Sequence, residues 1–148
     1  MDTLQRPDSS RAEQVAAAIV DAAIKVHKTL GPGLLESVYE ACLCYELTKR
    51  EIPYRQQVAL PVRYEEVFVE TGFRIDVLVD DSVIIELKCV DAIAPIHEAQ
   101  LLTYLKLANI RLGFILNFNV PLMKHGIKRM INYPSFPHIF FIFVPFAP

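Results

Sequence analysis

The chain has 148 residues, of which 53% are hydrophobic and 22% charged, and its formal net charge is −2. This composition excludes a mainly disordered chain, and the length suits a single folded domain. The balance of charge also excludes a strongly basic coat for nucleic acid, although a local basic groove remains compatible with it.

Three cysteines, Cys42, Cys44 and Cys89, do not predict a disulfide framework, because their number is odd and their contexts differ. Buried or half-buried thiols are favoured over a zinc site, since no second Cys/His pair lies nearby. Residues 1–14 contain no apolar stretch typical of a signal peptide, so a reducing, cytoplasmic location is expected. The longest apolar run, residues 139–144, is too short for a membrane-spanning helix of about 20 residues.

Two helices are predicted at the start of the domain. Apolar residues recur at helical spacing over residues 11–29, and Ser9 or Ser10 is the expected N-cap. The segment Gly31-Pro32-Gly33 ends this helix, and a second helix is predicted over residues 34–50. We expect the two helices to pack as a hairpin over the rest of the domain.

The following segments have the alternating or continuous apolar patterns of strands. In chain order they are residues 57–64, 67–70, 73–79, 83–90 and 112–117, with a short terminal strand within 119–132. Pro61 places the first strand at an edge or a bulge. A helix over residues 94–109 separates two strands, which implies a right-handed crossover between parallel neighbours. The predicted fold is therefore α/β, with a mixed sheet of about five strands flanked by helices.

Three charged residues interrupt two strongly apolar strands that a short loop joins into a hairpin. Glu86 and Lys88 are two residues apart and share one face of their strand. A loop of residues 80–82 sets the hairpin register so that Asp76 lies opposite Glu86. Two carboxylates and one ammonium group therefore converge on one face of the sheet.

These three groups need partners, because burying an unpaired charge costs several kcal/mol. One interpretation is a structural ion pair of Lys88 with Asp76 or Glu86 on a solvated face. The other is a divalent-metal site, since facing carboxylates repel unless a cation lies between them, and oxygen ligands favour Mg²⁺ or Mn²⁺. The apolar character of both strands favours the metal site, where a lysine can orient a water and stabilise developing charge.

The spacing Asp76-x9-Glu86-x-Lys88 resembles that of the PD-(D/E)XK nucleases. The segment Gly33-Leu34-Leu35-Glu36-Ser37-Val38-Tyr39 resembles the signature of the GxxExxY family, a branch of the same superfamily. The resemblance covers residues 12–132. It implies a restriction-endonuclease-like fold and metal-dependent cleavage of nucleic-acid phosphodiester bonds, with DNA favoured over RNA as the substrate.

The resemblance also implies individual roles. Asp76 and Glu86 are expected to bind Mg²⁺ or Mn²⁺, with the Leu87 carbonyl as an extra ligand, and Lys88 is expected to orient the attacking water. Glu36 is expected to help hold a metal-bound water. The alternative for Glu36 is a first-turn carboxylate that the helix dipole stabilises.

Gln100 and Tyr104 are four residues apart on one face of the third predicted helix. They resemble the Q-x3-Y motif of the exonuclease-like branch of the superfamily, whose helix lines the site. The resemblance implies that Gln100 contacts a nucleotide or positions Lys88, and that Tyr104 reaches a phosphate. The alternative is a helix edge with a buried tyrosine, and packing in the core is the favoured interpretation for Tyr39.

The expected organisation is a flexible leader of residues 1–10, a nuclease-like domain of residues 11–132 and an apolar, Phe- and Pro-rich tail of residues 133–148. Residues 139–146 are too apolar to remain in water, so they are expected to add an edge strand or to pack against a second subunit. A homodimer is favoured over the intrachain strand.

Two functions from different classes stay open. The intact set of Asp76, Glu86 and Lys88 favours an enzyme. The near-neutral charge and the small size favour an inactive, nuclease-like module for binding or assembly. Residues 124–129 hold the densest basic stretch, for which solvated surface is favoured over contact with a phosphate backbone.

Overall fold

The computed structural model describes residues 9–133. Within them the elements are α1 (Ser9–Leu30), α2 (Glu36–Lys49), β1 (Tyr54–Ala59), β2 (Val62–Tyr64), β3 (Val67–Val69), β4 (Arg74–Val79), β5 (Val83–Lys88), α3 (Pro95–Ala108), β6 (Leu112–Asn117), the 3-10 helix η1 (Met123–His125) and β7 (Ile127–Ile131). None of the helices in this part of the chain combines the length and apolar character needed to cross a membrane.

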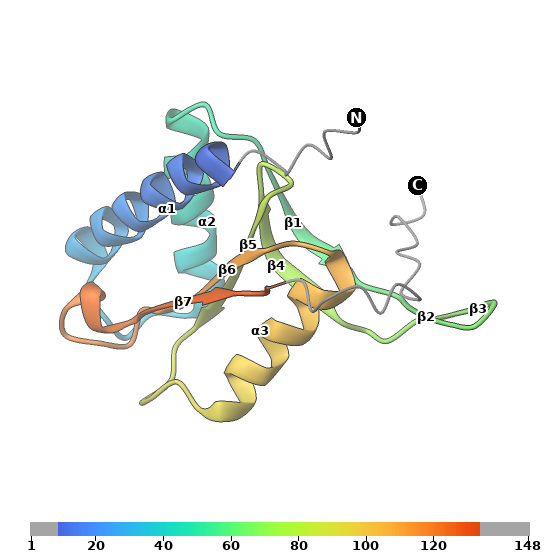
Figure 1. Ribbon diagram of the computed structural model, residues 1–148. Coiled ribbons are helices and arrows are strands. Elements are labelled where there is room, and N and C mark those ends of the chain that lie inside the picture. Colours follow the sequence, from blue (N-terminus) through green and yellow to red (C-terminus); the bar gives the residue numbers. More distant parts are fainter. Residues whose placement is uncertain (1–8, 134–148) are drawn as a thin grey trace.

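Five of the strands form a mixed sheet in the order β1-β4-β5-β6-β7. The neighbours β5 and β6 are parallel and are joined through α3, whereas the other neighbours are antiparallel. Helices α1 and α2 cover one face of the sheet and α3 covers the other (Figure 1). The predicted α/β architecture with a mixed five-stranded sheet is confirmed.

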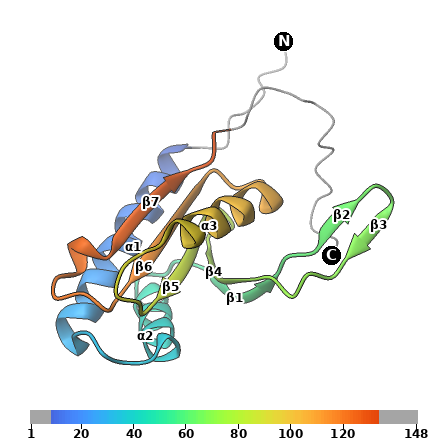
Figure 2. The ribbon, with the colours of Figure 1, turned by 90° about the horizontal axis from the view of Figure 1, so that it is seen from below.

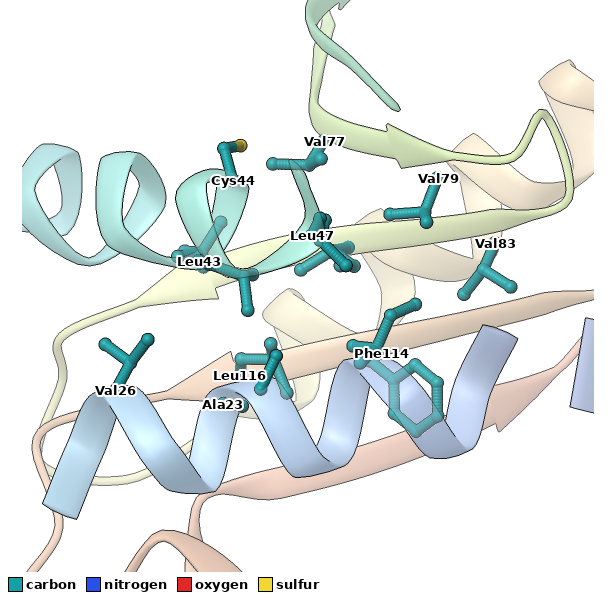
Figure 3. Close-up of a cluster of buried hydrophobic side chains, with 14 of the residues drawn as sticks. Ala23, Val26, Leu43, Cys44, Leu47, Val77, Val79, Val83, Phe114 and Leu116 are labelled. Carbon is teal, nitrogen blue, oxygen red and sulfur yellow. The ribbon is translucent and has the colours of Figure 1, made fainter. Parts of the chain in front are cut away.

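The central strands are buried on both faces, which explains their nearly continuous apolar sequence. Alternate residues of β5 face α1 and α2, while the residues between them face α3. In β4, Val77 and Val79 belong to the cluster on the α1 and α2 side, whereas Ile75 and Leu78 belong to the cluster on the α3 side. Figure 3 shows the larger cluster, in which α1, α2 and the strands contribute Ala23, Val26, Leu43, Cys44, Leu47, Val77, Val79, Val83, Phe114 and Leu116. Each large side chain buried there contributes about 1.5–3 kcal/mol of transfer free energy.

The strand predicted over residues 57–64 is wrong in one respect, because the chain forms two strands there. Strand β1 pairs with β4, whereas β2 and β3 form a separate hairpin that projects from the body (Figure 2). The break falls at Leu60 and Pro61. Leu60 is buried under α3 and donates its N–H to the Phe73 carbonyl (2.9 Å), while Pro61 has no N–H to donate.

The helix starts also differ from the predictions. Helix α1 includes Ser9 and Ser10, which were expected to precede it as caps, and α2 begins at Glu36, two residues later than Leu34. Residues 1–8 and 134–148 lie outside the described part of the chain. The predicted leader is therefore covered only at its end, and the predicted edge strand or subunit contact of the tail stays a prediction.

Candidate active site

Asp76 and Glu86 lie where the ladder between β4 and β5 ends. Its last paired residues are Val77 and Ile85. Beyond them the Asp76 N–H donates to Glu86 Oε1 (3.1 Å), and the Leu87 N–H donates to Asp76 Oδ2 (2.9 Å). Each carboxylate thus accepts a main-chain N–H from the other strand, in a charge-assisted bond that fixes its position. The predicted loop and register bring the two acidic side chains together.

The two carboxyl groups share a poorly solvated environment. Glu86 is 4% exposed and Asp76 is half-buried. Burial first, and then the charge of Asp76, raise the pKa of Glu86 to about 8. Burial also raises the pKa of Asp76, against the opposing effects of the Leu87 N–H and the charge of Lys88. Without a cation, burial and the proximity of two carboxyl groups therefore favour a proton on the pair.

This donor set fits a hard divalent cation. The Asp76 and Glu86 carboxylates each accept a main-chain N–H at the end of the same strand pair, so they lie near each other and are candidates to share one ion. Mg²⁺ typically binds one or two carboxylates and keeps several waters. Among residues 9–133 no group of three or more His, Cys, Asp and Glu side chains could hold a metal ion. Two carboxylates with main-chain or water oxygens are thus the ligands that this part of the chain offers.

A pocket of about 670 Å³ opens beside Asp76. It is lined by Leu34, Leu35, Glu36, Ser37, Glu40, Gln57, Asp76, Leu87 and Cys89. Glu36 is the first residue of α2, and its Oε1 accepts the Cys89 N–H (3.3 Å) just beyond the end of β5. The structure therefore brings together three residues predicted from the sequence, Glu36, Asp76 and Leu87.

Glu40 also lines this pocket, although the sequence analysis did not identify it. Its carboxylate accepts hydrogen bonds from Gln56 Nε2 (2.8 Å) and Gln57 Nε2 (3.0 Å). Gln57 has a φ of 52°, which breaks the alternation of β1 and lets consecutive amides reach the same helix. Burial and the charges of Asp76 and Glu36 raise the pKa of Glu40. The available signal was the spacing of Glu36 and Glu40, which share a helix face.

Lys88 shares the face of Glu86 on β5 and is half-buried. Its charge lowers the pKa of both Asp76 and Glu86. Nevertheless, its ammonium group forms no ion pair with any residue between 9 and 133, so the structural ion pair that the sequence left open is not formed there. Within the part of the chain that the structure describes, no carboxylate therefore occupies the ammonium group as an ion-pair partner.

Gln100 and Tyr104 lie on α3, on the other side of the sheet from α2. Gln100 Nε2 donates to Tyr104 Oη (2.9 Å). Tyr104 is 3% exposed and packs against Phe73, with 5.6 Å between ring centroids. Burial, and then the charge of Glu86, raise the pKa of Tyr104. The pair thus approaches the carboxylates from the α3 side and does not line the pocket that contains Glu36.

Two residues of the basic stretch near the end of the domain, Lys128 and Arg129, form ion pairs with acidic side chains. Lys128 Nζ lies 3.1 Å from Glu98 Oε1, and Arg129 Nη2 lies 2.5 Å from Glu13 Oε1. These ion pairs favour the interpretation of a solvated surface over a track for phosphates.

Comparison with known families gives one match. The family model of the PD-(D/E)XK nuclease superfamily matches residues 13–130, which extend from α1 to β7 and contain all the residues singled out above. No curated protein and no solved structure matches the chain.

Proposed function

The chain belongs to the PD-(D/E)XK nuclease superfamily, and from this premise we propose that it is a nuclease that uses Mg²⁺ or Mn²⁺ to hydrolyse phosphodiester bonds of nucleic acid, of DNA in preference to RNA. The observation that carries the proposal is the pair of Asp76 and Glu86, whose carboxylates each accept a main-chain N–H from the other strand, next to Lys88, which forms no ion pair with residues 9–133. Perturbed carboxyl groups of this kind gather at functional sites.

Each residue of the proposed site has a separate role in the reaction. Asp76 and Glu86 hold the cation, with the Leu87 carbonyl as an additional oxygen. A divalent cation held there would supply neutralisation of charge on the scissile phosphate and a more acidic water. The Lys88 ammonium donates hydrogen bonds to the attacking water and to a phosphate oxygen, which stabilises the charge that develops there. Glu36 orients water from the α2 side, and Gln100 and Tyr104 contact the substrate from the α3 side.

We further propose that the chain belongs to the GxxExxY branch, for which the segment from Gly33 to Tyr39 is the support. Residues 34–37 of this segment line the same pocket as Asp76. Cys42, Cys44 and Cys89 are free thiols, which supports a reducing, cytoplasmic setting.

Cleavage assays on labelled single- and double-stranded DNA and RNA test the proposal, with Mg²⁺, Mn²⁺ or a chelator. We expect metal-dependent cleavage that falls by about 100-fold or more in Lys88→Met. Lys106→Met is the matched control, because Lys106 is an exposed lysine of α3. Equal activity of Lys88→Met and the wild type would exclude this site, and no cleavage of any substrate by the wild type would exclude the enzyme.

A second candidate is the inactive module for binding or assembly, and the β2–β3 hairpin favours it. Tyr64 is 68% exposed, Val67 59% and Phe68 50%, which suits contact with another protein. Binding of nucleic acid or of a protein without cleavage would support this candidate.

Light scattering on the full chain and on a version that ends at Asn132 tests the predicted homodimer.

A further inference from the structure

The loop of residues 31–35, which leads into α2, is not held by a side-chain cap at the start of the helix. Helix α2 has Leu35 at its N-cap, and no side chain caps it there. The loop before it passes through Gly31 (φ 69°) and Gly33 (φ 100°), conformations that favour glycine. Because Glu36 is the first residue of the helix, the position of its carboxylate depends on how this loop is held.

One buried side chain closes the loop at both ends. The Tyr39 hydroxyl donates to the Gly31 carbonyl (2.5 Å) and accepts the Leu34 N–H (3.2 Å). The Tyr39 side chain is fully buried and both bonds are partly buried, which limits the access of water to the hydroxyl. The hydroxyl thus satisfies two backbone groups of the loop itself, on either side of Gly33, and links them to the helix that follows.

The same ring connects the loop to the strand that carries Lys88. The Tyr39 and Phe118 rings are stacked, with centroids 4.4 Å apart and an angle of 9° between their planes. The Phe118 N–H donates to the Lys88 carbonyl (3.0 Å). Tyr39 therefore contacts both the segment that precedes Glu36 and the segment that fixes the end of β5.

We propose that Tyr39 is a positioning residue of the site, whose hydroxyl holds the loop of residues 31–35 and thereby keeps the Glu36 carboxylate on the Cys89 N–H. Its catalytic meaning rests on the proposed function, because the inference concerns the geometry of the pocket that contains Asp76. The geometric part does not depend on activity, since the Leu34 and Cys89 amides report on the two ends of the connection.

Amide hydrogen exchange measured by NMR on the full chain tests the inference. In Tyr39→Phe the ring and its stacking remain while the hydroxyl is lost, so we expect exchange at Leu34 and at Cys89 to accelerate about fivefold or more. Tyr45→Phe is the matched control, because Tyr45 lies on the same helix and is 62% exposed. The control should leave both amides unchanged.

Phe118→Leu separates the hydroxyl from the packing. It removes the ring stack but keeps the hydroxyl bonds, so Leu34 should exchange more slowly in this variant than in Tyr39→Phe. Equal acceleration in both variants would overturn the inference, because packing alone would then hold the loop. An unchanged Cys89 amide in Tyr39→Phe would also overturn it, since Glu36 would then keep its place without the hydroxyl.

Cleavage gives a third readout. In Tyr39→Phe the Mg²⁺ concentration for half-maximal cleavage should rise about threefold or more, with kcat at saturating Mg²⁺ changed less, because the site must be ordered before it binds the ion. An unchanged half-saturation would overturn the link to the site. If the wild type neither binds Mn²⁺ nor cleaves, the proposed function fails, while the Leu34 and Cys89 exchange rates still decide whether Tyr39 positions Glu36.

Discussion

Two buried glutamates of this molecule have opposite surroundings. Glu46 of α2 is 6% exposed, and its carboxylate lies 3.0 Å from Lys25, 3.3 Å from Lys49 and 2.6 Å from Arg50. Hydrogen bonds from these cations, Lys25 first, lower its pKa to about 2. Glu86 is 4% exposed, and burial with a neighbouring carboxylate raises its pKa to about 8.

Low exposure alone therefore does not set the sign of the shift; the charges that come with it do. Glu46 is covered by cations that themselves reach solvent, with side chains that are 24–50% exposed, and it ties α2 to Lys25 of α1. Glu86 faces Asp76 and a lysine that does not pair with it. Within residues 9–133 no cation is ion-paired with Glu86, and a carboxyl group with this unmatched charge is a candidate for a functional site, whereas the paired Glu46 belongs to a structural cluster.

The largest expected effect comes from removing the unmatched charge. Glu86→Gln should lower metal-dependent cleavage by about 100-fold or more. The same variant should unfold at a higher temperature than the wild type at pH 9 without added metal. Because the folded-state pKa lies above the unfolded value of 4.5, folding loses stability as pH rises from 4.5 to 8, at about 1.4 kcal/mol per unit for a full proton.

Thermal or urea unfolding at pH 5 and pH 9 measures this change. The stability gained by Glu86→Gln should amount to about 2–4 kcal/mol at pH 9 and should be small at pH 5, where the wild-type carboxyl is protonated. If Glu86→Gln were less stable than the wild type at pH 9, the ionised Glu86 carboxylate would not destabilise the fold, and the prediction would be wrong.

The next effect concerns the cation that should balance the pair. Mg²⁺ must displace the proton from Glu86, so its affinity should rise with pH by up to about tenfold per unit below pH 8 and level off above it. Calorimetry in buffers of different ionisation enthalpy should show proton release at pH 7. Binding without proton release would mean that the ion does not use Glu86.

The contrast between these sites shows what could be predicted from the sequence. Alternation along two apolar strands and a short loop predicted that Asp76 lies opposite Glu86, because both are local properties. The fold class followed from the order of the patterns. The surroundings of Glu46 depend instead on how α1 and α2 pack, since Lys25 lies 21 residues away. The contacts of Glu40 depend on one left-handed residue, Gln57, which no pattern indicates.

Removing the matched charge should have a smaller effect of opposite sign. Glu46→Gln should destabilise the fold by about 1–2 kcal/mol at pH 7, a range reduced for the solvent exposure of its partners. Its folded-state pKa is below the unfolded value, so this stability is present above pH 4.5 and is lost as pH falls through about 2. Denaturant unfolding at pH 7 and pH 2 measures the change, and cleavage should remain at the wild-type level. A large loss of cleavage in Glu46→Gln would contradict the purely structural role of Glu46.

Added salt should change the stability effects of Glu46→Gln and Glu86→Gln differently, with a difference of about a few tenths of a kcal/mol or more. Raising the ionic strength from 0.1 M to 1 M shortens the screening length from about 10 Å to about 3 Å. The cost of Glu46→Gln should shrink, because its attraction is to cations that reach solvent. The gain from Glu86→Gln at pH 9 should persist, because burial is the first cause of its raised pKa and dissolved salt screens buried groups much less than exposed ones. Paired urea titrations at the two salt concentrations measure both changes. Equal screening of the two effects would mean that Glu86 is as accessible to solvent ions as the Glu46 cluster.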